Sequence, residues 1–331
     1  MKNKTAFLAS IIFLFSVPLF AQDVQFSFEP EFGCIYGTIF ENVWYASSRY
    51  SGNSIITTPT QRESQLDWQL QNAFYTGADV NLTLAQHYSF DFNFKFALPG
   101  LAGIMEDYDW LNPIHWPSDP ADELTNYSIH LNYLENFTKI RFCLGYKFIL
   151  NQNLNFSLTP KLGFETQSFY FTGKSGYSIY KSNGWEKQYF TYGATVITYS
   201  QAFIAPVAGL SMQIDFARHF EADLCLMLTY IHEYDAYDDH VEKHNTGRTC
   251  YFDDRLEDVF IFDAAAKLFW KINEHNKIGI KGTVNLAPPA YAYTYSSATS
   301  FEDLSDKPSL SDLGGTSRLL FTYALVYGFY F

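Results

Sequence analysis

The sequence has little positive charge and no long apolar run beyond its N-terminus. Lys and Arg together number 22 against 35 Asp and Glu, which gives a formal net charge of −13. Nucleic-acid binders gain affinity by neutralising phosphates with Lys and Arg, so we expect no nucleic-acid partner. A membrane-spanning helix needs about 18 or more consecutive apolar residues. Because no such run follows residue 21, a helical membrane protein is excluded.

Cysteine is also scarce. The chain has four, with no CxxC spacing among them: Cys34, Cys143, Cys225 and Cys250. Without that spacing, a zinc cluster or a dithiol redox motif is not supported. An exported chain is permitted disulfides but does not require them, so no pairing is predicted.

Aromatic residues, in contrast, make up 19% of the chain, with 25 Tyr and 32 Phe. Hydrophobic residues reach 47%, yet the mean hydropathy is −0.13, so apolar and polar residues are mixed rather than separated into blocks. This apolar content excludes disorder. The composition therefore predicts a folded, β-rich domain.

Residues 1–21 have the features of a secretory signal peptide. Lys2 and Lys4 form a positive start, residues 7–20 are apolar, and Ala21 is a small residue suited to cleavage. A retained anchor helix is the alternative, although the apolar stretch is short for a membrane span.

Apolar and polar residues alternate with a period of two along much of the chain, which is typical of β-strands. In residues 89–96 every second residue is Phe, and residues 321–331 repeat the pattern. The stretches 124–150 and 189–214 far exceed the usual strand of about 5–6 residues. Long strands with one aromatic face suit a closed sheet in lipid, because the bilayer core has no water to satisfy backbone groups.

We therefore predict an all-β fold, a ten-stranded antiparallel transmembrane β-barrel formed by residues 22–331 as a single domain. The strands are predicted at residues 25–40, 64–84, 88–98, 124–150, 154–172, 189–214, 219–234, 255–272, 277–296 and 317–331. Long polar loops are predicted at residues 41–63, 99–123, 173–188, 235–254 and 297–316. Bacterial barrels place short turns in the periplasm and long loops outside the cell, so both termini are expected on the turn side.

Four of the charged residues inside the predicted strands, and two adjacent prolines, have a predicted location in the barrel. Four charged side chains are expected to point into the barrel: Arg141, Lys147, Glu165 and Asp263. A ten-stranded barrel is narrow, so these side chains would plug it and disfavour a diffusion pore. Residues 288–289 are both Pro and are expected to mark a bulge or the rim.

Two acidic clusters are predicted at one rim of the barrel. Asp107 and Asp109 belong to the second long loop, and Asp238 and His240 belong to the fourth. Four strands separate these loops, and an even number of strands returns the chain to the same rim. Residues two apart in an extended segment point the same way. A carboxylate beside an imidazole favours a general base, so the set is suited to activating water for attack on a carbonyl.

Two other interpretations of these residues stay open on spacing alone. Acidic residues in exposed loops are usually no more than solvated surface, and Asp-x-His also occurs by chance. His240 and His244 have a spacing found among metal ligands, but no helix is expected there to present both on one face.

At these residues the chain resembles the omptins, outer-membrane proteases of Gram-negative bacteria. The segments that carry the resemblance are Ser64–Trp68, the Asp-x-Asp-Trp motif at Asp107–Trp110, Asn126–Tyr127, the Asp-x-His motif at Asp238–His240, and the aromatic end Tyr327–Phe331. They are spread over most of the chain after the signal. The ten-strand, five-loop plan is also similar to that of the family.

The resemblance implies an endopeptidase that acts on peptides and proteins without a metal or a covalent intermediate. His240 would be the general base, oriented by Asp238, while Asp107 and Asp109 would bind the attacking water. Omptins cut beside basic residues, and Glu41 resembles one of the acidic groups that recognise them. The competing interpretation is a non-enzymatic barrel of the same ancestry, an adhesin or a porin-like protein.

One position departs from the family pattern. The second acidic recognition group is expected two residues before the Asp-x-His motif, where this chain has Ala236, although the adjacent Asp235 is a candidate to compensate. The resemblance further implies a monomer in the outer membrane, with the active site outside the cell. It also implies that lipopolysaccharide is required as an activator.

Overall fold

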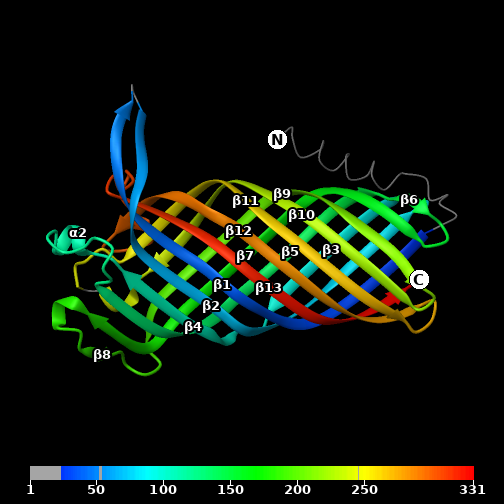
Figure 1. The fold of residues 1–331 in the computed structure, drawn as a ribbon, viewed down its shortest axis with the longest axis horizontal. Coiled ribbons are helices and arrows are strands. Elements are labelled where there is room, and N and C mark those ends of the chain that lie inside the picture. The colour runs from blue at the N-terminus through cyan, green and yellow to red at the C-terminus, as the bar shows by residue number, and fades with distance from the viewer. Residues whose placement is uncertain (1–23, 52–53, 245) are drawn as a thin grey trace, which may run out of the picture.

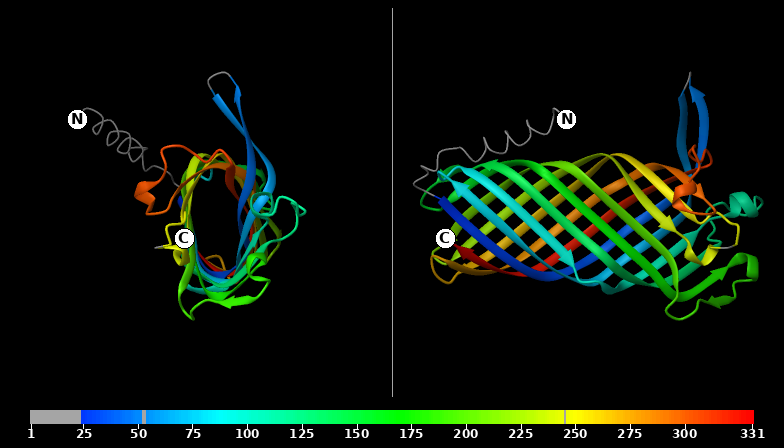
Figure 2. Two further views of the ribbon diagram at one scale, coloured as in Figure 1. Left: turned by 90° about the vertical axis from the view of Figure 1, so that its left-hand side faces the viewer. Right: turned by 180° about the vertical axis from the view of Figure 1, so that it is seen from behind.

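The computed structural model describes residues 24–51, 54–244 and 246–331. The predicted signal at residues 1–21 lies outside the described residues. A long barrel contains nearly all of the described chain, with the C-terminus at the end that carries the short turns (Figure 1). Seen along its axis, the ribbon of the barrel has an oval outline (Figure 2).

Ten barrel strands form a closed antiparallel ring, which confirms the predicted fold class. Their elements are β1 (Val24–Ser51), β2 (Ser54–Leu84), β3 (Tyr88–Ala97) with β4 (Gly100–Asp109), β5 (Asn126–Tyr146) with β6 (Phe148–Asn151), β7 (Phe156–Tyr180), β9 (Thr195–Ala217), β10 (Phe220–Asp239), β11 (Tyr251–Lys271), β12 (Asn276–Ser297) and β13 (Asp312–Tyr330). β3 and β4 form a single barrel strand, because both pair with β2 and with β5. β1 pairs with β13 and closes the ring.

The strands extend far into the predicted loops. β1 and β2 pair up to Ser51 and Ser54 and form a hairpin that projects from the rim, where a loop was predicted over residues 41–63. β4 occupies the first half of the predicted loop 99–123, and β10 runs through Asp239. The predicted loop-side ends of these strands were wrong. The outer wall near this rim faces water, so both faces of each strand carry polar residues and the alternation of apolar and polar residues disappears.

Short elements occupy what remains of the loops. These are α2 (Asn112–His115), η1 (Lys181–Asn183), β8 (Lys187–Tyr189), η2 (Val241–Lys243) and η3 (Phe301–Asp303). Among the described residues, no helix has the length and apolar character needed to span a bilayer. The bulge expected at residues 288–289 is confirmed, because the register of β12 against β13 shifts between Ala287 and Ala290.

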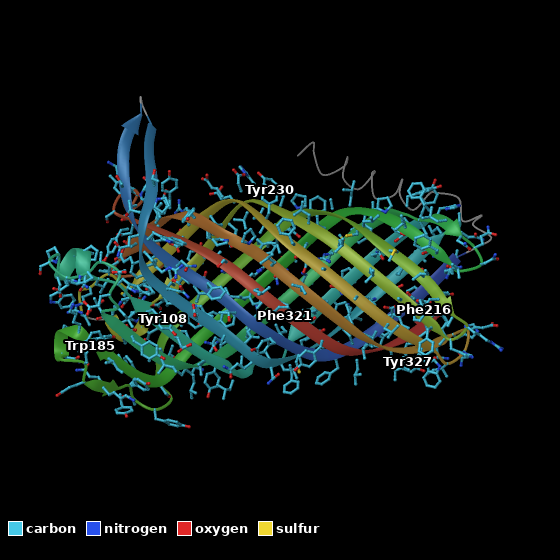
Figure 3. All side chains as sticks on the ribbon, in the orientation of Figure 1. Tyr108, Trp185, Phe216, Tyr230, Phe321 and Tyr327 are labelled. Carbon is cyan, nitrogen blue, oxygen red and sulfur yellow. The ribbon has the colours of Figure 1, made fainter. Side chains whose placement is uncertain are left out.

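Apolar side chains surround the outer wall of the barrel. Every barrel strand contributes at least one exposed large hydrophobic residue: Phe32, Phe74, Phe92, Phe142, Leu162, Ile204, Leu226, Phe262, Ile280 and Leu325. Figure 3 labels Phe216, Tyr230 and Phe321 on the same wall, and each is exposed. An apolar belt of this kind is what a barrel presents to lipid tails.

The interior is layered along the barrel axis. Successive inward residues of β7 are Glu165, Gln167, Phe169 and Phe171, and all four are buried. At the Glu165 level, ion pairs cross the barrel, including Lys139 Nζ to Asp263 Oδ2 at 2.8 Å. A cavity of about 1020 Å³ lies on the turn side of this level.

The predicted inward charges are confirmed. Arg141 pairs with Glu165 and Asp263, and Lys147 Nζ donates to Gln213 Oε1 at 3.1 Å. Closer to the loops, a cluster of buried aromatic and aliphatic side chains fills the barrel between the charged layer and the mouth. A filled interior disfavours a diffusion pore.

Candidate active site at the barrel mouth

The loop-side end of β4 positions Asp107 and Asp109. β4 lies between β2 and β5, and Asp107 pairs with Leu66 of β2. Because side chains alternate along a strand, the two carboxylates point the same way. Ser64 Oγ lies 3.4 Å from Asp107 Oδ1. Asn126 Nδ2 donates to Asp109 Oδ2 at 3.1 Å.

The end of β10 positions Asp238 and His240. Asp238 is buried, and the chain leaves the strand after Asp239. His240 Nε2 lies 2.8 Å from Asp238 Oδ2. The backbone N–H of His240 donates to the carbonyl of Cys250 at 2.8 Å, which holds the ring against the returning strand β11.

The charge on His240 depends on three neighbours. Burial is the largest effect and opposes protonation of the ring, but the charge and hydrogen bond of Asp238, together with Glu242, raise the pKa of His240 to about 10. Lys243 Nζ lies 2.9 Å from His240 Nδ1 and favours the neutral ring. Glu242 Oε1, 3.5 Å from the same nitrogen, favours the protonated ring.

Asp107 faces this pair across the mouth. Burial and then repulsion from Asp109 raise the pKa of Asp107 well above its usual range, while the charges of His240 and Lys243 act in the opposite direction. Repulsion from the Asp238 charge also raises the pKa of Asp107. The two acidic clusters therefore meet at one rim, as the even number of intervening strands predicts.

Glu41 lies lower in the mouth, on β1. It pairs with Leu66 of β2 and Thr316 of β13, and only 3% of its surface is exposed. Trp68 Nε1 donates to Glu41 Oε2 at 3.3 Å. The Trp68 ring stacks on Phe171 at 5.5 Å between centroids, so the floor below Glu41 is aromatic. Burial, and then repulsion from neighbouring carboxylates, raises the pKa of Glu41 well above its usual range.

The suggestion that Asp235 compensates for Ala236 is wrong. Asp235 faces the outside of the barrel, where it accepts a hydrogen bond from Tyr237 Oη at 3.2 Å. Ala236 is buried on the inward face together with Asp238. The residue directly opposite Ala236 on β11 is Asp254, which is also buried.

His244 does not join His240. Its Nε2 lies 2.6 Å from Asp239 Oδ1, and its ring stacks on Tyr251 at 4.9 Å. In the part of the chain that the structure describes, no group of three or more His, Cys, Asp or Glu residues is arranged to hold a metal ion. The four cysteines are free thiols.

The comparisons with known proteins show the family of the chain. The model of the omptin family matches residues 54–307, which is most of the chain. The chain belongs to the omptin family. Protease 7 of Escherichia coli O157:H7 is 25% identical over 283 residues, covering 82% of each chain. Outer membrane protease IcsP of Shigella flexneri is 26% identical over 271 residues, covering 81% of this chain and 79% of its own.

The omptin fold is also found in a solved structure. Outer membrane protease OmpT from Escherichia coli superimposes with a TM-score of 0.75 at 19% identity, covering 96% of this chain and 99% of that chain. Fold and family together identify this omptin as a protease of the bacterial outer membrane.

Sequence reasoning missed several residues of this omptin site. The sequence singles out neither Lys243 nor Asp254, although both lie beside the predicted residues. Trp68, which donates to Glu41, enters only as the end of the segment Ser64–Trp68. Asp254 was detectable in principle, because alternation from the buried Leu256 places it on the inward face. The loop expected over residues 235–254 includes Asp254 and so hides its place on a strand. No signal in the sequence pointed to Lys243, whose position depends on the turn η2.

Proposed function

We propose that this omptin is an endopeptidase in which His240 acts as general base on a water held by Asp107 and Asp109. The observation that carries the proposal is the 2.8 Å contact between His240 Nε2 and Asp238 Oδ2, opposite the half-buried Asp107 carboxyl. A carboxylate on Nε2 fixes the tautomer and makes Nδ1 the basic nitrogen. Lys243 Nζ lies 2.9 Å from Nδ1, so the attacking water would take the place of Lys243 at that nitrogen.

The proposed reaction has two proton transfers. His240 Nδ1 takes a proton from the water while the water oxygen attacks the substrate carbonyl carbon. Asp107, whose raised pKa favours a retained proton, shares that proton with Asp109 and donates a hydrogen bond to the developing oxyanion. His240 then gives its proton to the leaving nitrogen, and the peptide bond breaks into a carboxylic acid and an amine.

The protonation state of His240 limits this reaction. Because Asp238 and Glu242 together offset burial and raise the pKa of His240 to about 10, most rings carry a proton at neutral pH. A protonated ring cannot accept a proton from water. We therefore expect kcat/KM to rise with pH through the neutral range.

Recognition of the substrate is proposed to rest on Glu41. A buried carboxylate without a cation of its own gains most from a substrate side chain that brings one. Cleavage beside Lys or Arg is therefore expected. The mouth is proposed to face the exterior of the cell, the protein to act as a monomer, and lipopolysaccharide on the outer wall to be required for activity.

A peptide assay with two variants tests the proposal. Protein refolded with lipopolysaccharide is expected to cleave a fluorogenic peptide that contains Arg-Arg. His240→Ala and Asp107→Asn are expected to abolish cleavage, while heat-modifiable gel mobility shows that the barrel persists. Cleavage that survives both substitutions would refute the assignment.

The competing functions give different results in the same preparation. An adhesin would bind cells equally well with those residues replaced, and a pore would give stepwise conductance in planar bilayers. Loss of cleavage with EDTA, restored by zinc, would favour a metal site at His240 and His244.

A further inference from the structure

Three buried carboxylates meet below His240. Glu41 comes from β1, Asp238 from β10 and Asp254 from β11, and each is at most 6% exposed. The charges of both Asp238 and Asp254 repel that of Glu41. Only Asp238 has an ion-pair partner, His240, among the residues that the structure describes. Glu41 and Asp254 therefore have no ion-pairing cation of their own in the described chain to stabilise their ionised forms.

Burying such a cluster of carboxyl groups costs free energy unless a positively charged group lies beside it. Buried carboxylates are normally paired, or bound to a cation, because desolvation disfavours the charged form. One oxygen of Asp238, Oδ1, is buried and has no hydrogen-bond partner. An unpartnered buried oxygen beside two unpaired carboxyl groups indicates a place for a positively charged group from outside the chain.

The Asp254 carboxyl group is held in position from two strands. Thr294 Oγ1 of β12 donates to Asp254 Oδ1 at 2.6 Å and itself accepts a hydrogen bond from the Gly314 N–H at 2.8 Å. A Cβ atom at Gly314 would lie only 2.0 Å from Asp254 Oδ1. The absence of a side chain at Gly314 is therefore what allows the carboxyl group to occupy this space.

The location of Asp254 matters because of its partner across the sheet. Asp254 lies directly opposite Ala236 in the β10–β11 register, and both side chains are on the inward face. Cβ atoms of directly opposed residues are about 4.5–5.5 Å apart. A carboxyl group at position 254 therefore lies in the same part of the mouth as a carboxyl group at position 236 would. The small methyl group of Ala236 leaves the space beside Asp254 open.

We propose that Asp254 is a specificity-determining residue, which with Glu41 forms a two-carboxylate subsite for the cationic side chain of the substrate. This inference rests on the proposed peptidase function. In this protein, the second carboxylate of the subsite comes from β11 and not from β10. Its occupant is a Lys ammonium or an Arg guanidinium, which brings the positive charge that the cluster lacks.

The test compares two peptides that differ only in charge. One carries Arg at the cleaved position and the other carries citrulline, the neutral isostere of Arg. For Asp254→Asn, kcat/KM for the Arg peptide is expected to fall about tenfold to a hundredfold, the range for losing a hydrogen bond between charged groups. Cleavage of the citrulline peptide is expected to change little.

A matched control removes the same charge from the next residue. Asp253 faces the opposite side of β11, where its Oδ2 accepts a hydrogen bond from Arg255 Nε at 3.0 Å. Asp253→Asn should leave the Arg preference unchanged. Adding Ala236→Asp to Asp254→Asn should restore the preference, because the two positions are directly opposed.

The outcomes separate this inference from the proposed function. If Asp254→Asn slows both peptides equally, or neither, Asp254 has at most a structural role and the inference is overturned while the peptidase proposal stands. If Asp254→Asn with Ala236→Asp shows no more preference for Arg over citrulline than Asp254→Asn alone, the placement of Asp254 in the subsite is also overturned. If the unmodified protein cleaves neither peptide, the proposed function fails and the inference fails with it.

A measurement on the unmodified protein covers the case in which Asp254→Asn does not fold. Burial, and then repulsion from Asp238 and Asp253, raises the pKa of Asp254 to about 7. Glu41 faces it from β1 and His240 keeps its proton in this range. The ratio of kcat/KM for the two peptides should therefore fall about tenfold from pH 8.5 to 5.5. A constant ratio would overturn the inference.

Discussion

Replacing Asp238 by Asn tests the coupling on which the proposed base depends. The substitution keeps the shape of the side chain but removes the charge 2.8 Å from His240 Nε2. The ordinary pKa of the ring is 6.5, and in this site it is about 10. The ring therefore holds its proton roughly 3000-fold more tightly than a free imidazole, or by about 5 kcal/mol.

Without the Asp238 charge, burial and Lys243 favour the neutral ring, and Glu242 alone of the three neighbours favours the protonated ring. We expect the pKa of His240 to fall below its ordinary value. The acid limb of kcat/KM against pH should then move down by about three units or more. The plateau should drop by roughly 10²–10⁴-fold, because Asn no longer fixes the tautomer and stabilises the imidazolium less.

The measurement is the cleavage rate of an Arg peptide between pH 5 and pH 10, with gel mobility as the check of folding. Asp239→Asn is the matched control, since it removes the same charge one residue away, where the carboxylate binds His244. Its profile should keep the original acid limb. An acid limb that stays in place in Asp238→Asn would show that His240 is not the group that titrates.

Three further predictions follow from the same site. Lys243→Met removes a charge that disfavours protonation of His240, so the acid limb should move to higher pH by about one unit in the same assay. Gly314→Ala should displace the Asp254 carboxyl group and reduce the Arg-to-citrulline preference about tenfold, whereas Gly282→Ala, where a Cβ would meet nothing closer than 4.0 Å, should not. Protein refolded in detergent without lipopolysaccharide should show no cleavage and gain it on addition, as a rate assay across a lipopolysaccharide titration would reveal.

The barrel could be predicted from the sequence wherever lipid contacts it. In the membrane-facing part, one face of each strand is apolar. The apolar residues therefore recur with a period of two, which predicts strands at residues such as 89–96 and 321–331. Above the apolar belt the outer wall meets water. There the outward Asp235 and the inward Asp238 are both polar, so alternation no longer marks the strand.

The candidate site was predictable where a short spacing carries it. Asp107 with Asp109, and Asp238 with His240, follow from residues two apart on strands that end at one rim. Asp254 depends on the register of β10 against β11, which no local pattern specifies.

The proposed mechanism requires that Asp107 and His240 act on a single water molecule. The most direct test is the cleavage rate of Asp107→Asn, His240→Ala and the double variant, each corrected for the folded fraction. Groups that act as a unit give non-additive losses, so the double variant should be no slower than the more damaged single one, with all three about 10³-fold or more below the unmodified protein. Losses that multiply, or cleavage that persists in the double variant, would contradict the claim.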